Sequence, residues 1–142
     1  MTGLTLALLL QTVVVSAGEK DYASAYKEME ETGRPLVVLI GADWCPACQS
    51  LKHGTIANMK SAGEFSEVSF TTINTDQDPT LANKLMKGGS IPQLVVYTQS
   101  NKGWRRMQLT GNQSRGSVRD LLRRAVDLRK TATTTKSPTT TK

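Results

Sequence analysis

The sequence of 142 residues contains only two cysteines, Cys45 and Cys48, and a single histidine, His53. Structural zinc is held by four ligands, usually Cys and His, so this short supply disfavours a zinc site around the cysteine pair. The chain also lacks a sequence motif for binding nucleic acid, although it carries a net charge of +6. The sequence therefore predicts no metal site and no nucleic-acid partner, and the chemistry of the two thiols remains to be explained.

The first seventeen residues contain no charged side chain, and residues 4–15 are nearly all apolar. This stretch of about a dozen residues is short for a transmembrane helix, which needs roughly twenty. Val15, Ser16 and Ala17 fit a signal-peptidase site, so residues 1–17 are predicted to be a signal peptide that is cleaved after Ala17. Because no Lys or Arg precedes the apolar stretch, an uncleaved membrane anchor or a buried N-terminal strand is an open alternative.

A signal peptide predicts export to a periplasmic or extracellular location. Disulfides persist there, so a lone pair of neighbouring cysteines must be kept reduced by an electron donor or must act as an oxidant. Contact with a membrane is expected only if the N-terminal segment is not cleaved.

The rest of the chain has the composition of one folded domain followed by a low-complexity tail. With 38% hydrophobic and 21% charged residues, the sequence can form one modest core. We expect this domain to cover residues 18–130 and to be a monomer. Residues 131–142 are rich in Thr and are expected to be disordered, as an idle tail or as a glycosylated stalk.

The two cysteines lie three positions apart, after an apolar run at 36–40 and a short connection that ends at Trp44. If a helix begins at Cys45, its free backbone N–H groups and its dipole favour a thiolate there, which makes Cys45 the attacking sulfur. Cys48 lies one turn further along and can reach Cys45, which makes Cys48 the sheltered, resolving sulfur and leaves Cys45 exposed. Pro46 suits the first helical position, where its missing N–H is not needed. A static structural disulfide is the alternative.

Hydrophobic periodicity divides the chain into alternating helices and strands. Helices are predicted at 21–32, 45–59, 78–86 and from Ser117 onward, and strands at 36–40, 67–74, 94–97 and 104–109. The last helix begins with a pattern that resembles a capping box, Ser117 followed by Asp120. The order α, β, α, β, α, β, β, α indicates an α/β protein.

Several motifs occur in an order and spacing that resemble proteins with the thioredoxin fold. They are Ala42-Asp43-Trp44-Cys45-x-x-Cys48, the segment at 74–79, Ile91-Pro92 and Gly111. The similarity covers about residues 21–128. It implies an α/β thioredoxin fold with a central mixed four-stranded sheet, helices on both faces, and a cis peptide bond at Ile91-Pro92 that lies against the cysteines. Because the chain enters almost directly at the helix predicted for 21–32, we expect the family's first edge strand to be absent or reduced.

The resemblance also implies how a substrate would bind beside Cys45. The backbone of Ile91 would pair with an extended segment of the substrate, and Pro92 would shape the groove. The alternative is that Pro92 merely starts a strand. Trp44 would flank the reactive sulfur, cap the core, or do both.

Two positions depart from the family's pattern. Reducing members often have a buried Asp six residues before the first cysteine and a Lys near it on the next strand, which serve proton transfer to the resolving thiol. Here those positions are Leu39 and Thr72. Both charges are missing together, so neither is buried alone, but the usual proton route to Cys48 is absent. We hypothesise that water or the nearby Asp43 assists instead.

The dipeptide between the cysteines, Pro46-Ala47, also differs from the Gly-Pro that is usual in reducing thioredoxins. Together with Asp43, these residues are candidates for modulating the reactivity of the pair. Strong oxidants have a very acidic first thiol that local donors or positive charge stabilise, whereas no Lys, Arg or His separates these cysteines. We therefore expect reductase or exchange activity rather than oxidase activity.

Basic residues recur on the last predicted helix. Arg115, Arg119 and Arg123 follow one another every four residues, with Arg124, Arg129 and Lys130 nearby. We expect a solvated face there, and attraction of an acidic partner or a membrane surface is the alternative.

The sequence favours an exported thiol-disulfide oxidoreductase that acts on cysteine-containing proteins, is re-reduced by an upstream redox partner and needs no cofactor. The alternative is a binding or adaptor module of the same fold whose disulfide stays closed. A role in delivering electrons for the assembly of haem or copper proteins is neither supported nor excluded.

Overall fold

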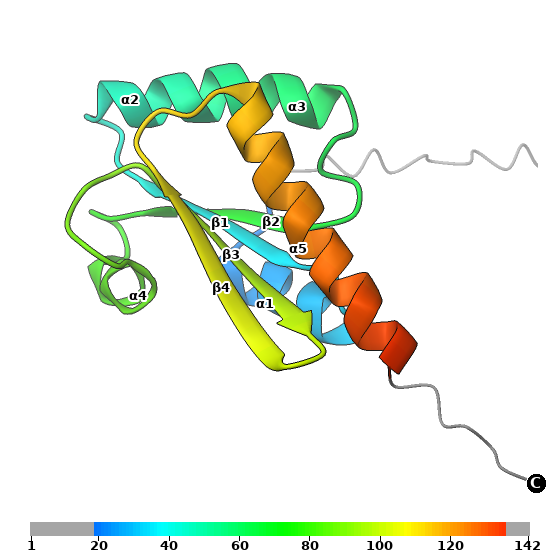
Figure 1. Ribbon diagram of the computed structural model, residues 1–142. Helices are drawn as coiled ribbons and strands as arrows, with labels where there is room; N and C mark the ends of the chain where they lie inside the picture. Colours follow the sequence, from blue (N-terminus) through cyan, green and yellow to red (C-terminus); the bar gives the residue numbers. More distant parts are fainter. Residues whose placement is uncertain (1–18, 136–142) are drawn as a thin grey trace, which may run out of the picture.

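The computed structural model describes residues 19–135 (Figure 1). Helices and strands follow in the predicted order: α1 (Tyr22–Thr32), β1 (Leu36–Gly41), α2 (Pro46–Gln49), η1 (Ser50–Ile56), α3 (Ala57–Ser61), β2 (Ser69–Asn74), α4 (Pro79–Leu85), β3 (Gln93–Ser100), β4 (Gly103–Thr110) and α5 (Arg115–Thr135). The predicted signal peptide at 1–17 and the end of the predicted tail, 136–142, lie outside the described residues.

The four strands form one mixed sheet in the order β2-β1-β3-β4. β1 runs parallel to β2, while β3 is antiparallel to both β1 and β4. In the central strand β1, Leu39 pairs with Thr72 on one side and with Leu94 on the other. No strand precedes α1 within residues 19–135, so β2 is an edge strand of the described sheet. The predicted thioredoxin fold is confirmed.

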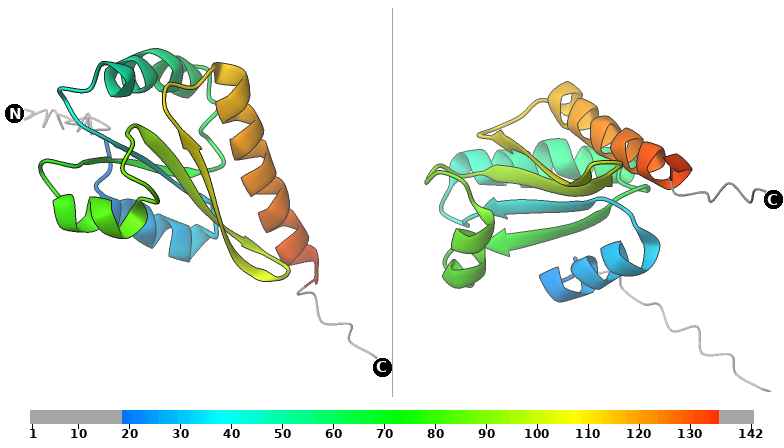
Figure 2. Two further views of the ribbon diagram at one scale, coloured as in Figure 1. Left: turned by 60° about the vertical axis from the view of Figure 1, so that its left-hand side comes forward. Right: turned by 60° about the horizontal axis from the view of Figure 1, so that its bottom comes forward.

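Helices cover the sheet on both faces, and each face has its own core (Figure 2). The segment α2-η1-α3 and the long helix α5 pack on one face, against Val37, Leu39, Phe70, Leu94 and Val96. Helices α1 and α4 pack on the other face, against Leu36, Val38, Ile40, Ile73 and Val95. β1 therefore contributes apolar side chains to both cores, which explains why its sequence is continuously apolar rather than alternating.

Local signals fix the bounds of α1. Asp21 is its N-cap, and its carboxylate accepts a hydrogen bond of 2.8 Å from the backbone N–H of Ser24. Gly33 ends the helix with φ of 70°, a conformation that favours glycine. Because both caps are local, the prediction for 21–32 is nearly exact in its bounds.

The helix that carries the cysteines is continuous but not uniformly α. After one turn of α2, residues 50–56 adopt a π-helix before α3 resumes α geometry. Leu51 and Ile56 are buried in this segment, and His53 is exposed. An apolar stripe indicates which side of a helix is buried but carries no information about an extra residue in one turn, so the sequence predicts only an ordinary helix at 45–59.

The last helix begins earlier than predicted and extends into the predicted tail. It begins at Arg115 rather than Ser117, because the hydroxyl of Ser114 accepts a hydrogen bond from the backbone N–H of Ser117 (3.2 Å) and so provides the cap. At the other end the helix continues through Thr135, beyond the predicted start of the tail at residue 131. The hydroxyls of Thr131, Thr133, Thr134 and Thr135 donate to carbonyls three or four residues earlier, which satisfies helical acceptors there.

Candidate active site

Cys45 and Cys48 form a disulfide, with their Cα atoms 5.2 Å apart. Cys45 is the N-cap of α2, and Pro46 occupies the first helical turn, as predicted. The backbone N–H of Cys48 points at the Sγ of Cys45 at 3.2 Å. In the dithiol form this N–H group, at the positive end of the helix, is placed to stabilise a thiolate on Cys45.

The expected contrast between an exposed Cys45 and a sheltered Cys48 is absent from the disulfide form. The two residues are 6% and 4% exposed. Each sulfur covers the other, and they form a small apolar cluster with Ala42, against which Ala47 and Ile91 pack. Access to Cys45 therefore depends on its immediate neighbours, Ala47 and Ile91, rather than on a sulfur that projects into solvent.

Gly41, the last residue of β1, lies directly against the resolving cysteine. A Cβ atom on Gly41 would be 3.0 Å from both the Cβ and the Sγ of Cys48. This distance is tighter than most real Cβ contacts, so the absence of a side chain at Gly41 leaves the room that the sulfur occupies. The sequence reasoning treated this glycine only as part of a connection, because the contact joins residues from different elements.

Trp44 lies beside the cysteines and is 69% exposed. Its indole N–H donates a hydrogen bond of 2.9 Å to Asp76, which follows β2. Such exposure places Trp44 at the surface next to Cys45 and rules out the alternative that it caps the core. Asp76 belongs to the segment at 74–79 that contributes to the family resemblance. In the structure, Asp76 is the hydrogen-bond partner that orients this indole.

The peptide bond between Ile91 and Pro92 is cis, as the resemblance predicts. The side chain of Ile91 packs against the cysteine cluster, and Pro92 is buried immediately before β3. Within residues 19–135, no backbone–backbone hydrogen bond involves Ile91. Its N–H and C=O groups are thus free to pair with an extended chain laid beside Cys45.

Gln93 holds the loop that carries Ile91 and Pro92, a function that the sequence reasoning missed. Its side chain is fully buried and donates to the carbonyls of Lys87, Gly88 and Ser90, at 3.1, 3.2 and 2.9 Å. Its amide oxygen accepts from the N–H of Lys87 at 3.2 Å. The available signal was a polar residue at the start of an otherwise apolar strand, because a buried amide needs partners.

A cavity of about 260 Å³ opens behind Cys48, between the ends of β1 and β2 and the helix that follows the cysteines. Leu39 and Thr72 line it, so the two positions at which the family's charged pair is missing do lie beside the resolving sulfur. Asp43 also lines this cavity. The other lining side chains are mostly polar: Glu19, Gln49, Lys52, Asn74 and Gln77.

Comparison with known proteins agrees with this geometry. A family model described as thioredoxin-like matches residues 17–99. The chain belongs to the thioredoxin-like family. Among solved structures, it is similar to a thioredoxin from Thermus thermophilus, at 20% identity and a TM-score of 0.60 over 72% of this chain and 82% of that one.

Two further thioredoxin-like structures are similar to this chain. A thioredoxin from Fasciola hepatica is 25% identical, with a TM-score of 0.57 over 72% of this chain and 92% of its own. The protein Trxlp from Edwardsiella tarda is 19% identical, with a TM-score of 0.56 over 73% and 95%. The thioredoxin-like fold and its close cysteine pair are those of a thiol-disulfide oxidoreductase in general.

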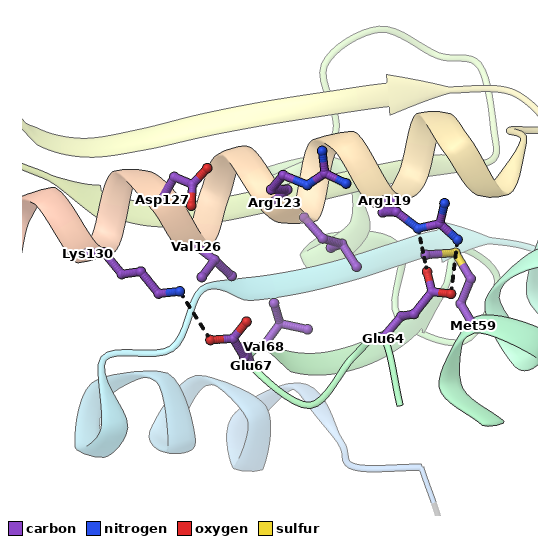
Figure 3. A pocket seen from close by; sticks show the side chains of 10 residues that line it. Met59, Glu64, Glu67, Val68, Arg119, Arg123, Val126, Asp127 and Lys130 are labelled. Atoms are coloured by element: carbon purple, nitrogen blue, oxygen red, sulfur yellow. Dashed lines mark hydrogen bonds and ion pairs between the residues drawn. The ribbon is translucent and has the colours of Figure 1, made fainter. Parts of the chain in front are cut away.

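A second hollow, of about 240 Å³, lies between α5 and the loop before β2 and shares no residue with the cavity behind Cys48 (Figure 3). At its rim Glu64 accepts hydrogen bonds from Arg115 and from Arg119, the latter at 3.1 Å. These bonds lower the pKa of Glu64 to about 2. Lys130 pairs with Glu67 at 3.6 Å.

The basic side chains of α5 lie at the surface, as expected, with Arg115, Arg119, Arg123 and Lys130 between 45% and 64% exposed, and several of them also hold other segments. Arg115, Arg119 and Lys130 fasten the loop before β2 to the helix, and the guanidinium of Arg129 donates to the carbonyl of Thr32 at 2.7 Å. The partners lie far away in the sequence, so the charge pattern of the helix alone did not reveal them. The hollow in Figure 3 is therefore part of the scaffold.

None of the helices within residues 19–135 has the length and apolar character that crossing a bilayer requires. In the same part of the chain, no three His, Cys, Asp or Glu side chains are arranged to hold a metal ion.

Proposed function

We propose that this protein is an exported protein-disulfide reductase that works through the Cys45-Cys48 couple. The observation that carries the proposal is the position of Cys45 at the start of a helix, with the N–H of Cys48 directed at its sulfur. The free backbone of Ile91 beside that sulfur supports binding of an extended, cysteine-containing protein segment.

In the proposed reaction, the thiolate of Cys45 attacks one sulfur of a substrate disulfide. The substrate S–S bond breaks, one substrate thiolate leaves and is protonated, and a mixed disulfide joins Cys45 to the substrate. Cys48 then loses its proton and attacks the Sγ of Cys45, which releases the second substrate thiol and closes the protein's own disulfide. Two electrons pass from the cysteine pair to the substrate, so an upstream thiol donor must reopen the pair after each cycle.

Reduction of insulin by dithiothreitol in the presence of the protein tests this proposal. We expect the protein to accelerate the reduction, and we expect Cys45→Ser to abolish the acceleration. The alternative, a binding or adaptor module with a closed structural disulfide, predicts equal rates with the wild-type protein and with Cys45→Ser. Equal rates would reject the proposal that the protein is an enzyme.

Export is a separate part of the proposal and rests on the apolar stretch at 4–15 and the small residues at 15–17. N-terminal sequencing of the protein recovered from outside the cytosol should begin at Gly18. Recovery of the chain with its first residues intact in a membrane fraction would instead support the uncleaved anchor.

A further inference from the structure

The cavity behind Cys48 contains two charged groups, Glu19 and Lys52, that the sequence did not associate with the cysteines. Leu39 and Thr72, which line its inner part, cannot take up a proton from a thiol. The ionisable side chains that line it besides Cys48 are Glu19, Asp43 and Lys52, from three separate segments of the chain. Residue 19 lies before α1 and is remote from the cysteines in sequence, yet it shares the cavity with Cys48.

Glu19 and Lys52 form an ion pair across this cavity. The Nζ of Lys52 is 3.3 Å from the Oε2 of Glu19, and the two side chains are 37% and 33% exposed. Lys52 lies four residues after Cys48 on the same helical segment, so it holds Glu19 on the side of the resolving cysteine. Glu19 also borders a neighbouring hollow with His53 and Lys60. Apart from Cys48 and Asp43, the other ionisable side chains that line these two hollows, Lys52, His53 and Lys60, are basic.

We propose that the Glu19 carboxylate, positioned by Lys52, accepts the proton of Cys48 through water in this cavity. The inference rests on the proposed function and names the group that replaces the missing proton route. A volume of about 260 Å³ holds several water molecules at roughly 30 Å³ each, and the lining is polar enough to bind them. Asp43 also lines the cavity and is an exposed residue like Glu19, so the feature that distinguishes Glu19 is its ion pair with Lys52.

The proton balance of the resolving step is complete with these groups. The Cys48 thiol gives its proton through water to Glu19, and the Cys48 thiolate forms the bond to the Sγ of Cys45. The bond between Cys45 and the substrate sulfur breaks, and the leaving substrate thiolate takes a proton from solvent. Glu19 returns its proton to solvent, so no further reactant is consumed.

A small aromatic disulfide that releases a coloured thiolate separates the two steps. Mixed rapidly with the reduced protein, it should release one thiolate when Cys45 attacks and a second when Cys48 resolves the mixed disulfide. Cys48→Ser should give only the first release. At a pH below the pKa of Cys48, Glu19→Gln should slow the second release about a hundredfold or more, the lower end of the range for loss of a general base, and leave the first unchanged. Glu30→Gln, an exposed carboxylate on α1, is the matched control and should change neither step.

A second measurement separates proton transfer from simple electrostatics. In a Cys45→Ser background, ultraviolet absorbance of the thiolate against pH reports the pKa of Cys48. Glu19→Gln should lower this pKa, because it removes a negative charge, and Lys52→Gln should raise it. A lower pKa alone gives more thiolate and a faster second release. A slower release together with a lower pKa therefore identifies Glu19 as the proton acceptor.

This experiment distinguishes failure of the proposed role of Glu19 from failure of the proposed enzyme function. If the wild-type protein gives no first release, the enzyme proposal itself fails. If both releases occur and the second is unchanged or faster in Glu19→Gln, the role of Glu19 is overturned. A second release that slows in Asp43→Asn and not in Glu19→Gln would transfer the role to Asp43.

Discussion

At the scale of single residues, the site depends on contacts around Cys48 as much as on Cys45. Cys45 lies at the start of a helix and accepts a hydrogen bond from the backbone N–H of Cys48, three residues later. Both features are local in sequence, so the role of Cys45 could be predicted. The second is confined by Gly41 on one side and faces a polar cavity on the other. Those neighbours come from distant segments, so no local pattern revealed them.

Gly41→Ala tests the close contact with the resolving sulfur. The added methyl group would meet Cys48 at 3.0 Å, and overpacking of this kind costs about 1–3 kcal/mol of unfolding free energy. The loss of unfolding free energy should be larger in the oxidised protein, because the disulfide fixes the position of the sulfur. The reduction potential of the cysteine pair should therefore rise. Urea unfolding of both redox forms measures this.

Gly54→Ala is the matched control for that experiment. Gly54 lies in the helical segment η1, and nothing lies within 4 Å of a Cβ built there. The change should be neutral or stabilise the protein by about 0.5–1 kcal/mol, since alanine has the higher helix propensity. Equal destabilisation by the two substitutions would show that the contact at Gly41 has no special importance.

At the scale of elements, strands and helices are well predicted where their signals are local. Asp21 and Gly33 bound α1 as expected, and the apolar run of β1 gives a buried strand. The start of α5 was misplaced because Ser114 and Ser117 are both plausible caps, and only the fold selects between them. The π-helix depends on tertiary packing and had no sequence signature. The loop held by Gln93 had one weak signal, a polar residue at the start of an otherwise apolar strand.

Gln93→Leu tests the loop that presents Ile91 and Pro92. Leucine fits an apolar strand but leaves the carbonyls of Lys87, Gly88 and Ser90 without their donor. We expect a loss of about 2–3 kcal/mol in unfolding free energy and weaker binding of protein substrates, seen as a higher KM. Gln99→Leu, at an exposed position of the same strand, should leave both unchanged. Similar losses in both variants would contradict the assigned role.

The link between α5 and the loop before β2 predicts a pH dependence of stability. The pKa of Glu64 is about 2 in the folded protein because Arg119 and Arg115 donate to it, and its ordinary value is 4.5. A lowered folded-state pKa contributes stability above pH 4.5 that is lost as the pH falls towards 2. Glu64→Gln should therefore be less stable than the wild-type protein near pH 6, and the difference should shrink towards pH 2.

Chemical denaturation at several pH values measures the difference in unfolding free energy between Glu64→Gln and the wild-type protein. Glu67→Gln is the matched control. Glu67 lies in the same loop with one exposed partner, Lys130, so its loss should matter less. If the difference in unfolding free energy between Glu64→Gln and the wild-type protein stays constant from pH 6 to pH 2, the proposed role of the Glu64 ion pairs is contradicted.

At the scale of the whole molecule, the thioredoxin-like fold could be predicted because its motifs keep their order along the chain. The mixed four-stranded sheet, the two covered faces and the cis peptide bond all follow from that resemblance. The direction of electron flow does not, because one fold spans a wide range of potentials. The potential within that range is set by charges and donors around the first sulfur. The charged residues next to the motif are Asp43, two positions before Cys45, and Asp76, the hydrogen-bond partner of Trp44, and negative charges do not favour a thiolate.

These surroundings predict a reducing couple. We expect a potential closer to that of thioredoxin, roughly −270 mV, than to that of strong oxidants of this fold, roughly −120 mV. Equilibration with glutathione buffers of graded ratio, followed by thiol trapping, gives the value. A potential at the oxidising end would reverse the proposed direction of electron flow.

The central claim is that Cys45 bonds covalently to a substrate sulfur and that Cys48 breaks this bond. Mass spectrometry of Cys48→Ser after exposure to a disulfide-containing protein tests it most directly. The account predicts a stable mixed disulfide through Cys45 that a reductant removes, and no such adduct in Cys45→Ser. An equal yield of adduct in Cys45→Ser, or no adduct in either variant, would contradict the account.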